Sequence, residues 1–306
     1  MRKWVLLLTV LIGIGGTHAT AGQAVAGQAA KAATIGRPAT LDAAISDWIA
    51  KLAKQPPFAE WKEAVWQAYP LGAGMHGWVV LLRANGKETG YLVVGAEPDG
   101  QVKLVEYGAG PYPLFSDITL YRSLITMEAL PESMTYSQYS VRSGLTGKER
   151  LYLSPLAALW KVSLPDGTTV YVDAKTGETL PLSEQLIDAE KRRSAAFDIS
   201  AVAAAPGNKV VSSALQATFD PYGRLPWLTR MPAPAADDAA LAHMLADNRT
   251  TGAAKLYGGK LFYAYPVIGL QQWNSGVKYA ALDQDGIRFI PTRIVRDRLR
   301  LYPQRR

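Results

Sequence analysis

The sequence predicts an α+β fold in which two helix-plus-antiparallel-sheet units precede a β-rich C-terminal module. Apolar residues recur at helical spacing in two separate stretches of the chain. Each stretch is followed by short apolar segments that Asn-Gly or Asp-Gly pairs divide, and the C-terminal third contains further segments of this kind. A helix followed by hairpin-linked strands is typical of helices packed on one face of an antiparallel sheet.

The N-terminus has the pattern of a secretory signal peptide. Arg2 and Lys3 precede an uncharged run over residues 4–16, and Ala19-Thr20-Ala21 fits a small-x-small cleavage site. We therefore expect a signal peptide over residues 1–21, cleaved near Ala21, and a secreted or extracytoplasmic protein associated with the cell envelope. An uncleaved anchor is the alternative. The run is shorter than the roughly 20 residues of a membrane span, so we expect no transmembrane span in the mature chain.

Composition excludes several kinds of chemistry. The 306 residues include no cysteine, so the chain has no disulfide, thiol nucleophile or thiolate-bound metal cluster. The sequence contains no His-Glu-x-x-His or Gly-x-Ser-x-Gly motif, and His76 and His243 fit ordinary surface or half-buried positions. We expect no catalytic residue, no metal site and no cofactor.

The first unit is expected at residues 41–115, after a flexible leader at 22–40 that is rich in Ala and Gly. Its first helix is predicted by apolar residues at helical spacing, namely Leu41, Ile45, Trp48 and Leu52. Pro56-Pro57 ends this helix and begins a second, short one that extends to Val65. Strands are predicted at residues 77–83, 90–95 and 102–107, with turns at Asn85-Gly86 and Asp99-Gly100.

The second unit is expected at residues 116–194. Ser116 or Asp117 is placed to cap a helix that Pro131 ends. Strands are predicted at 135–141 and 151–153, followed by a hairpin about Asp166-Gly167. A charged helix is predicted over 183–194.

One tract of this unit has a recognisable pattern. It begins with Trp160-Lys161-Val162, turns at Asp166-Gly167 and continues as Tyr171-Val172-Asp173-Ala174-Lys175-Thr176-Gly177-Glu178. The tract resembles the PepSY domain family, which occurs in exported bacterial proteins and in the propeptides of secreted proteases. The resemblance covers about a fifth of the chain. It implies PepSY/cystatin-like units and regulation of a peptidase.

The resemblance is weaker elsewhere in the chain. Trp78 opens a comparable hairpin in the first unit, which ends in Pro98-Asp99-Gly100 in place of the Asp-Ala-x-Thr-Gly pattern. The two units are therefore either divergent copies or unrelated hairpins that share turn chemistry. The whole chain also resembles secreted proteins of Gram-positive spore formers, and that resemblance implies no activity.

The C-terminal module is expected at residues 209–306, after a linker at 195–208 that is rich in Ala, Gly and Pro. Strands are predicted at 210–219, 261–267, 277–282 and 287–290, with turns at 220–223 and Asp285-Gly286. Asp237 or Asp238 can cap a short helix between the first two strands. The module ends in a basic tail.

Two groups of residues in this module are candidates for binding. Tyr263, Tyr265 and Trp273 could stack on sugars if a sheet exposes them, although aromatic residues on strands also form cores. A second group of four arginines has only Asp297 as a nearby acid: Arg293, Arg296, Arg298 and Arg300. With a chain charge of +7, these arginines could hold teichoic acid, phospholipid or an acidic protein, or form a solvated end.

Three functional hypotheses follow. The first is an exported non-catalytic binding protein, whose partner is a secreted peptidase or an anionic envelope polymer. We expect no nucleic-acid partner, because export separates the protein from nucleic acid. The second is a carboxylate-dependent cell-wall or polysaccharide hydrolase. Its candidate acids lie on or near one predicted hairpin: Glu97, Asp99 and Glu106. The third is an envelope scaffold without a specific ligand. The sequence leaves the oligomeric state open.

Overall fold

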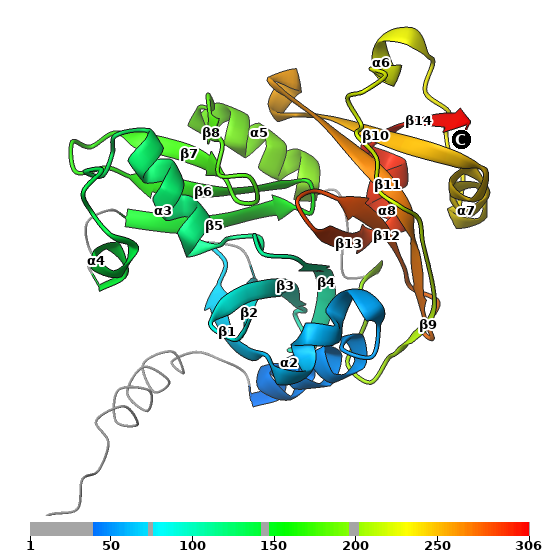
Figure 1. The fold of residues 1–306 in the computed structure, drawn as a ribbon, viewed down its shortest axis with the longest axis horizontal. Helices are drawn as coiled ribbons and strands as arrows, with labels where there is room; N and C mark the ends of the chain where they lie inside the picture. Colours follow the sequence, from blue (N-terminus) through cyan, green and yellow to red (C-terminus); the bar gives the residue numbers. More distant parts are fainter. Residues whose placement is uncertain (1–38, 73–75, 142–146, 196–201, 306) are drawn as a thin grey trace, which may run out of the picture. The chain divides into compact units, whose positions relative to one another are not determined.

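Two antiparallel sheets, one of ten strands and one of four, form the framework of the described chain (Figure 1). A computed structural model describes residues 39–72, 76–141, 147–195 and 202–305. The predicted signal peptide, nearly all of the predicted leader and residues 196–201 of the predicted linker lie outside these ranges. The described residues belong to one compact unit. The mixed α+β class with antiparallel sheets is confirmed.

The first segment contains two helices and four strands. They are α2 (Ala39–Leu52), the 3-10 helix η1 (Pro56–Glu63), β1 (Val65–Pro70), β2 (Gly77–Ala84), β3 (Lys87–Ala96) and β4 (Val102–Ala109). The predicted first helix and three strands are confirmed. Asn85 and Gly86 both have positive φ, 51° and 75°, and connect the paired residues Ala84 and Lys87. This is the two-residue hairpin that an Asn-Gly pair favours.

The prediction that a helix extends to Val65 is wrong. The backbone becomes extended at Ala64, with φ −78° and ψ 136°, and Val65 begins the edge strand β1. The Val65 side chain is 71% exposed, whereas Phe58 and Trp61 are buried. Helical spacing therefore identified the two residues that pack inward and extended the element two residues too far.

The second segment contains the smaller sheet and three helices. They are α3 (Asp117–Thr126), α4 (Tyr136–Val141), β5 (Gly147–Ser154), β6 (Ala157–Ser163), β7 (Thr169–Asp173), β8 (Thr179–Leu180) and α5 (Glu184–Ala195). The predicted cap of α3 is confirmed, because the Ser116 side chain accepts a hydrogen bond from the Thr119 amide.

The predicted strand at residues 135–141 is wrong, since helix α4 occupies this stretch. Thr135 and Gln138 form a reciprocal cap: the Thr135 amide donates to the Gln138 side chain, and the Gln138 amide donates to Thr135 Oγ1. Tyr136 and Tyr139 then lie on one face and contact Tyr121 of α3. The capping box satisfies free amides of the first turn and selects the helix over the strand.

The third segment is rich in strands, as expected. It contains β9 (Val210–Leu215), α6 (Pro226–Thr229), α7 (Asp238–Asp247), β10 (Asn248–Leu256), η3 (Tyr257–Gly259), β11 (Leu261–Trp273), β12 (Lys278–Asp283), β13 (Ile287–Pro291), α8 (Thr292–Arg298) and β14 (Arg300–Arg305). Asp237 caps α7 as predicted. Strand β10 was not predicted because Gly and Ala are weak strand formers. The residues of the predicted basic tail form α8 and β14.

The larger sheet is made of two meanders that meet at their last strands. Its order is β1-β2-β3-β4-β13-β12-β11-β10-β14, with β9 paired to β11. Each meander follows a helix, α2 in the first and α7 in the second. At the seam between β4 and β13, Tyr107 pairs with Phe289 and Gly108 with Arg288. The Tyr107 and Phe289 rings stack with centroids 5.0 Å apart.

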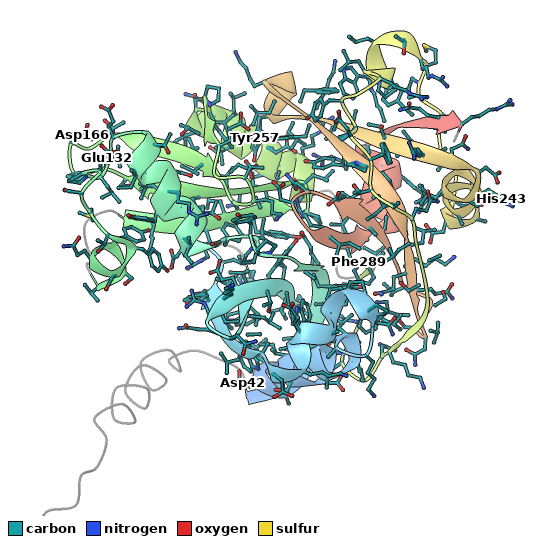
Figure 2. The ribbon with its side chains drawn as sticks, in the orientation of Figure 1. Asp42, Glu132, Asp166, His243, Tyr257 and Phe289 are labelled. Carbon is teal, nitrogen blue, oxygen red and sulfur yellow. The ribbon has the colours of Figure 1, made fainter. Side chains whose placement is uncertain are left out.

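Both faces of the central strands are buried. On β2, Val80 and Leu82 contact the core that contains α2, whereas Val79 and Leu81 contact the core that contains α3 and one face of the smaller sheet. Strands buried on both faces read as continuous apolar runs, which explains the sequence of β2. The seam strand β13 is also buried on both faces (Figure 2).

Phe289 provides a test of the seam. It is fully buried and packs on Tyr107 and Phe58. We expect Phe289→Ala to lower the free energy of unfolding by about 3–5 kcal/mol, because it removes buried apolar surface and leaves a cavity. Phe262→Ala, at a partly exposed position, is the matched control, with a loss below about 1.5 kcal/mol. Denaturant unfolding measures both, and equal losses would contradict the placement of Phe289 in the core.

Candidate functional site

The three aromatic candidates lie inside the protein. Trp273 is fully buried, and its indole nitrogen donates to the Tyr107 hydroxyl at 3.1 Å. Tyr265 is buried, and burial raises the pKa of its hydroxyl. Tyr263 is half-buried beside Tyr265, and its hydroxyl donates to Asp173 at 3.3 Å. These rings contribute to the core, the alternative that the sequence left open.

The four candidate arginines have different surroundings. Arg293 pairs with Asp297 at 3.5 Å within α8, and Arg296 pairs with Asp238 at 3.2 Å. Arg298 forms an ion pair with the buried Glu190 of α5. Arg300 is exposed on the edge strand β14. The structure therefore brings Arg298 and Arg300 together and directs Arg293 and Arg296 to other partners.

Arg298 and Arg300 line a groove of about 660 Å³ in the third segment. We call it the C-terminal groove. Its other basic residues are Arg193 and Lys255, and its acid is Asp297. Lys255 and Arg300 lie on neighbouring strands, β10 and β14. Positive charge that has no ion-pair partner among the described residues thus converges on this groove from α5, β10 and β14.

Five exposed apolar side chains lie on α6, next to it in the chain, or on β11, and two of them, Leu228 and Phe262, line this groove. We call them the apolar lip: Tyr222, Leu225, Leu228, Met231 and Phe262. Met231 is 87% exposed and Leu228 is 71% exposed. Trp227 of α6 packs between Tyr222 and Phe262, with ring centroids 5.5 and 5.0 Å away. Trp227, Leu228 and Phe262 line the groove itself, so the lip and the basic residues form one surface.

The sequence contained a signal for this lip. Residues 224–231 contain four large apolar side chains, at Leu225, Trp227, Leu228 and Met231, a composition that is unusual for a solvated loop. Leu225 has φ +39°, a left-handed conformation that is unfavourable for a branched residue. In Figure 1, α6 projects beyond strands β10 and β14. The backbone therefore presents these side chains to solvent at a conformational cost.

A second group of polar residues lies at the seam. A β-bulge at Val105 shifts the register between β3 and β4, so that Val93 pairs with Glu106 and Val94 pairs with Leu104. Leu104 faces the core that contains α2. The bulge turns Glu106 to the opposite face, where it meets polar partners.

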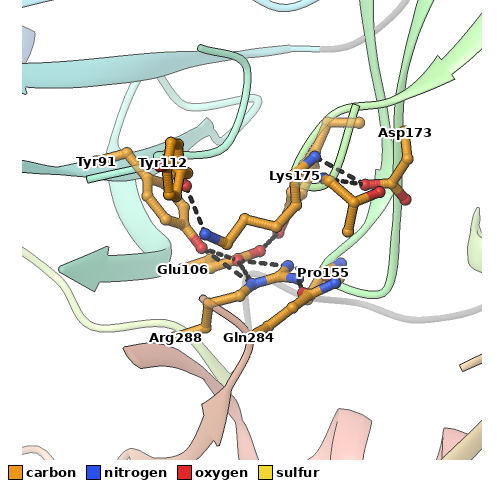
Figure 3. A network of polar contacts seen from close by, with 10 residues as sticks. Tyr91, Glu106, Tyr112, Pro155, Asp173, Lys175, Gln284 and Arg288 are labelled. Atoms are coloured by element: carbon orange, nitrogen blue, oxygen red, sulfur yellow. Dashed lines mark hydrogen bonds and ion pairs between the residues drawn. The ribbon is translucent and has the colours of Figure 1, made fainter. Parts of the chain in front are cut away.

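Glu106 is fully buried and pairs with Arg288 (Figure 3). The Arg288 guanidinium donates to Glu106 Oε1 from Nη2 at 2.8 Å and from Nε at 3.0 Å. The Tyr91 hydroxyl donates to Oε1, and the Tyr152 hydroxyl donates to Oε2 at 2.7 Å. Burial raises the pKa of both tyrosines, which remain hydrogen-bond donors.

Arg288 connects this pair to the smaller sheet. Its Nη2 donates to the Pro155 carbonyl, in the turn between β5 and β6, at 2.5 Å, and its Nη1 donates to Gln284. Burial is the largest single influence and lowers the pKa of Arg288, but the Glu106 carboxylate, together with Tyr91 and Tyr265, outweighs it and raises the pKa of the guanidinium well above its ordinary value. The network joins β3, β4, β13 and the smaller sheet at one point.

Lys175, in the Asp-Ala-x-Thr-Gly turn, lies close to this network (Figure 3). It is only 5% exposed, and its ammonium donates to the carbonyls of Tyr112 and Asp285. Burial, with a contribution from Arg288, lowers the pKa of Lys175 from 10.5 to about 8. Carboxylates of Asp285, Asp173 and Glu106 act in the opposite direction without balancing it.

The carboxylates considered for hydrolysis are not arranged as a facing pair. Glu106 is buried with Arg288, whereas Asp99 is exposed in the turn after β3 and accepts from the Gln101 amide at 2.9 Å. The Glu97 carbonyl closes the same turn. His76 and His243 are exposed, the latter on α7 (Figure 2).

Searches against protein-family models, curated proteins and solved structures find no match to this chain. In residues 39–305, apart from the three undescribed gaps, the helices are too short or too polar to cross a membrane.

Lys175 gives the protein a testable pH dependence. The native state binds its proton less tightly than the unfolded state, so Lys175 adds stability as pH rises from about 8 to 10.5. Relative to Lys175→Met, the wild type should therefore gain up to about 3 kcal/mol over this window. Urea unfolding at several pH values between 7 and 10.5 measures the difference.

The exposed Lys255→Met variant controls for the loss of a lysine. A difference between wild type and Lys175→Met that is independent of pH would contradict the burial of this ammonium.

Proposed function

We propose that this chain is an exported, non-catalytic protein that docks on an anionic lipid surface of the cell envelope through its third segment. The observation that carries the proposal is the apolar lip beside the basic C-terminal groove. The export part of the proposal rests on the signal-peptide pattern of residues 1–21.

The apolar lip favours a lipid layer over a hydrophilic polymer. Single exposed apolar residues are normal on protein surfaces, but a group of them around a short helix identifies an interaction surface. Leu228 and Met231 extend into solvent, and Trp227 is held among aromatic neighbours. Transfer of such side chains into acyl chains is favourable by about 25 cal/mol per Å². A soluble polyanion offers no apolar phase in return.

The basic residues supply the second part of the attraction. Arg193, Lys255 and Arg300 are exposed at the groove, and Arg224 and Arg230 flank α6. Each cation close to an anionic leaflet contributes about 1 kcal/mol of binding free energy. Salt screens this attraction, which falls off over a Debye length of about 10 Å. Arg298 is omitted from this group because Glu190 already neutralises it. Apolar insertion and charge attraction together give the two contributions that stable peripheral binding requires.

PepSY-like architecture remains part of the proposal. Its support is the Trp160–Glu178 tract and the recurrence of a helix followed by an antiparallel meander in each of the three segments. Regulation of a peptidase is carried by the resemblance alone and stays a prediction. The hydrolase alternative requires two carboxylates that face each other. Glu106 is buried in an ion pair with Arg288, so it is not available as one of the two.

Vesicle binding tests the proposal. Residues 22–306, which lack the predicted signal peptide, should co-sediment with phosphatidylglycerol-containing vesicles and not with pure phosphatidylcholine vesicles. Leu228→Ser with Met231→Ser should weaken binding at least ten-fold because it removes the inserted side chains. Lys255→Glu with Arg300→Glu should weaken it by a similar factor and reduce its salt dependence.

The control variants for vesicle binding change exposed residues that do not line the C-terminal groove. Val65→Ser with Val141→Ser changes two exposed apolar side chains, and Lys87→Glu changes an exposed lysine at the start of β3. Neither should alter binding. Equal binding to both vesicle types, or binding that survives the lip variant, would contradict the proposal. Binding to soluble polyphosphate that exceeds vesicle binding would favour a polymer ligand.

A further inference from the structure

A second cavity lies between α3 and the turn that follows β7. Its volume is about 500 Å³, within the range of small-molecule sites. Lys175 is at its buried wall, Arg122 is at its exposed side, and Tyr112, Met127 and Asp285 complete the part considered below. The cavity is distinct from the C-terminal groove, with which it shares no lining residue.

Among the described residues, one N–H donor of the Lys175 ammonium has no hydrogen-bond acceptor. It donates to the carbonyls of Tyr112 and Asp285, and both of these residues line the cavity. A lysine ammonium has three N–H donors. Within the described residues, the third donor has no acceptor and no carboxylate lies within ion-pair distance. A buried cation without a counter-charge is costly, so an anion that reaches it is strongly favoured.

The wall formed by α3 contributes another unsatisfied group. The Oγ1 of Thr119 is buried and has no hydrogen-bond partner among the described residues, although Thr119 lines the cavity. Gly177, opposite it, has φ +76°, and a Cβ there would lie 2.8 Å from Thr119 Cγ2. Only glycine lets the turn approach α3 so closely. The turn and the helix thus hold an ammonium and a hydroxyl on the same cavity.

We infer that this cavity binds a small organic monocarboxylate, with its carboxylate at Lys175 and its apolar part against Met127 and the ring of Tyr112. Arg122, whose guanidinium lies 6.0 Å from the centre of the Tyr112 ring, adds positive charge at the outer side.

The charge of the rim selects among anions. Glu178 and Asp285 also line the cavity and are exposed. Their carboxylates repel a dianion such as phosphate more than a monoanion, because Coulomb repulsion scales with ligand charge. The lowered pKa of Lys175 is consistent with an ammonium that lacks an anion, and a bound carboxylate should raise it.

Calorimetry with benzoate, the neutral isostere benzamide and inorganic phosphate tests this site. At pH 7 we expect benzoate to bind in the millimolar range or tighter, and benzamide and phosphate at least ten-fold more weakly. Above pH 8, benzoate binding should take up protons, measured as a dependence of the heat on the ionisation enthalpy of the buffer. Equal affinities for benzoate and benzamide, or tighter binding of phosphate, would overturn the inference.

Variants identify the residues. Lys175→Met should reduce benzoate affinity at least ten-fold and abolish proton uptake, and an unchanged affinity would overturn the inference. Thr119→Val with Arg122→Gln leaves Lys175 in place and should weaken benzoate several-fold, so it decides the matter if Lys175→Met does not fold. Lys255→Met should leave benzoate binding unchanged. Lys175→Met should leave vesicle binding unchanged. A negative result for benzoate therefore does not bear on the C-terminal groove, and a negative result for vesicles does not bear on this cavity.

Discussion

Glu106 and Arg288 lie in the interior of the protein, where either charge alone would be very costly. An isolated ion in a low-dielectric interior loses several kcal/mol of solvation, and a buried pair recovers this only when its hydrogen bonds are nearly complete. Two tyrosine hydroxyls, the Pro155 carbonyl and Gln284 complete the bonds of this pair. The seam between β4 and β13, and the approach of the smaller sheet to it, are therefore constrained to one arrangement.

This constraint has consequences for the second cavity. Glu106 is paired with Arg288, so it is not available as a close partner for Lys175. The positive charge of Arg288 further disfavours the charged form of Lys175. Burial of three charged groups in one region leaves an excess of one positive charge, and that excess faces the cavity beside α3. The C-terminal groove shares no residue with this pair, and its positive charges that have no ion-pair partner in the described chain come from β10, β14 and α5. Structural and binding charges are thus divided between the interior and the surface.

Local features of the fold could be predicted from the sequence, whereas its long-range pairings could not. Helix α2, the Asn85-Gly86 hairpin and the Ser116 cap depend on neighbouring residues and were read correctly. Strand β10 depends on partners in β11 and β14, and its own residues favour no strand. Helix α4 has a local signal in the sequence, because Thr135 and Gln138 have capping-box spacing.

The candidate site was anticipated only in part. Arg298 and Arg300 were identified by charge density, and the aromatic candidates Tyr265 and Trp273 proved to be core residues. The Glu106–Arg288 pair joins residues 182 positions apart, and a β-bulge determines which face Glu106 occupies. Neither the separation nor the bulge leaves a pattern in one sequence.

A double-mutant cycle at the seam tests the central claim that this buried pair fixes the arrangement. Glu106→Gln and Arg288→Met should each lower the free energy of unfolding by about 3–5 kcal/mol, because each leaves a partner unsatisfied. The double variant should lose at least about 2 kcal/mol less than the sum, since neither charge is then left alone. Losses that add within about 0.5 kcal/mol would contradict the account.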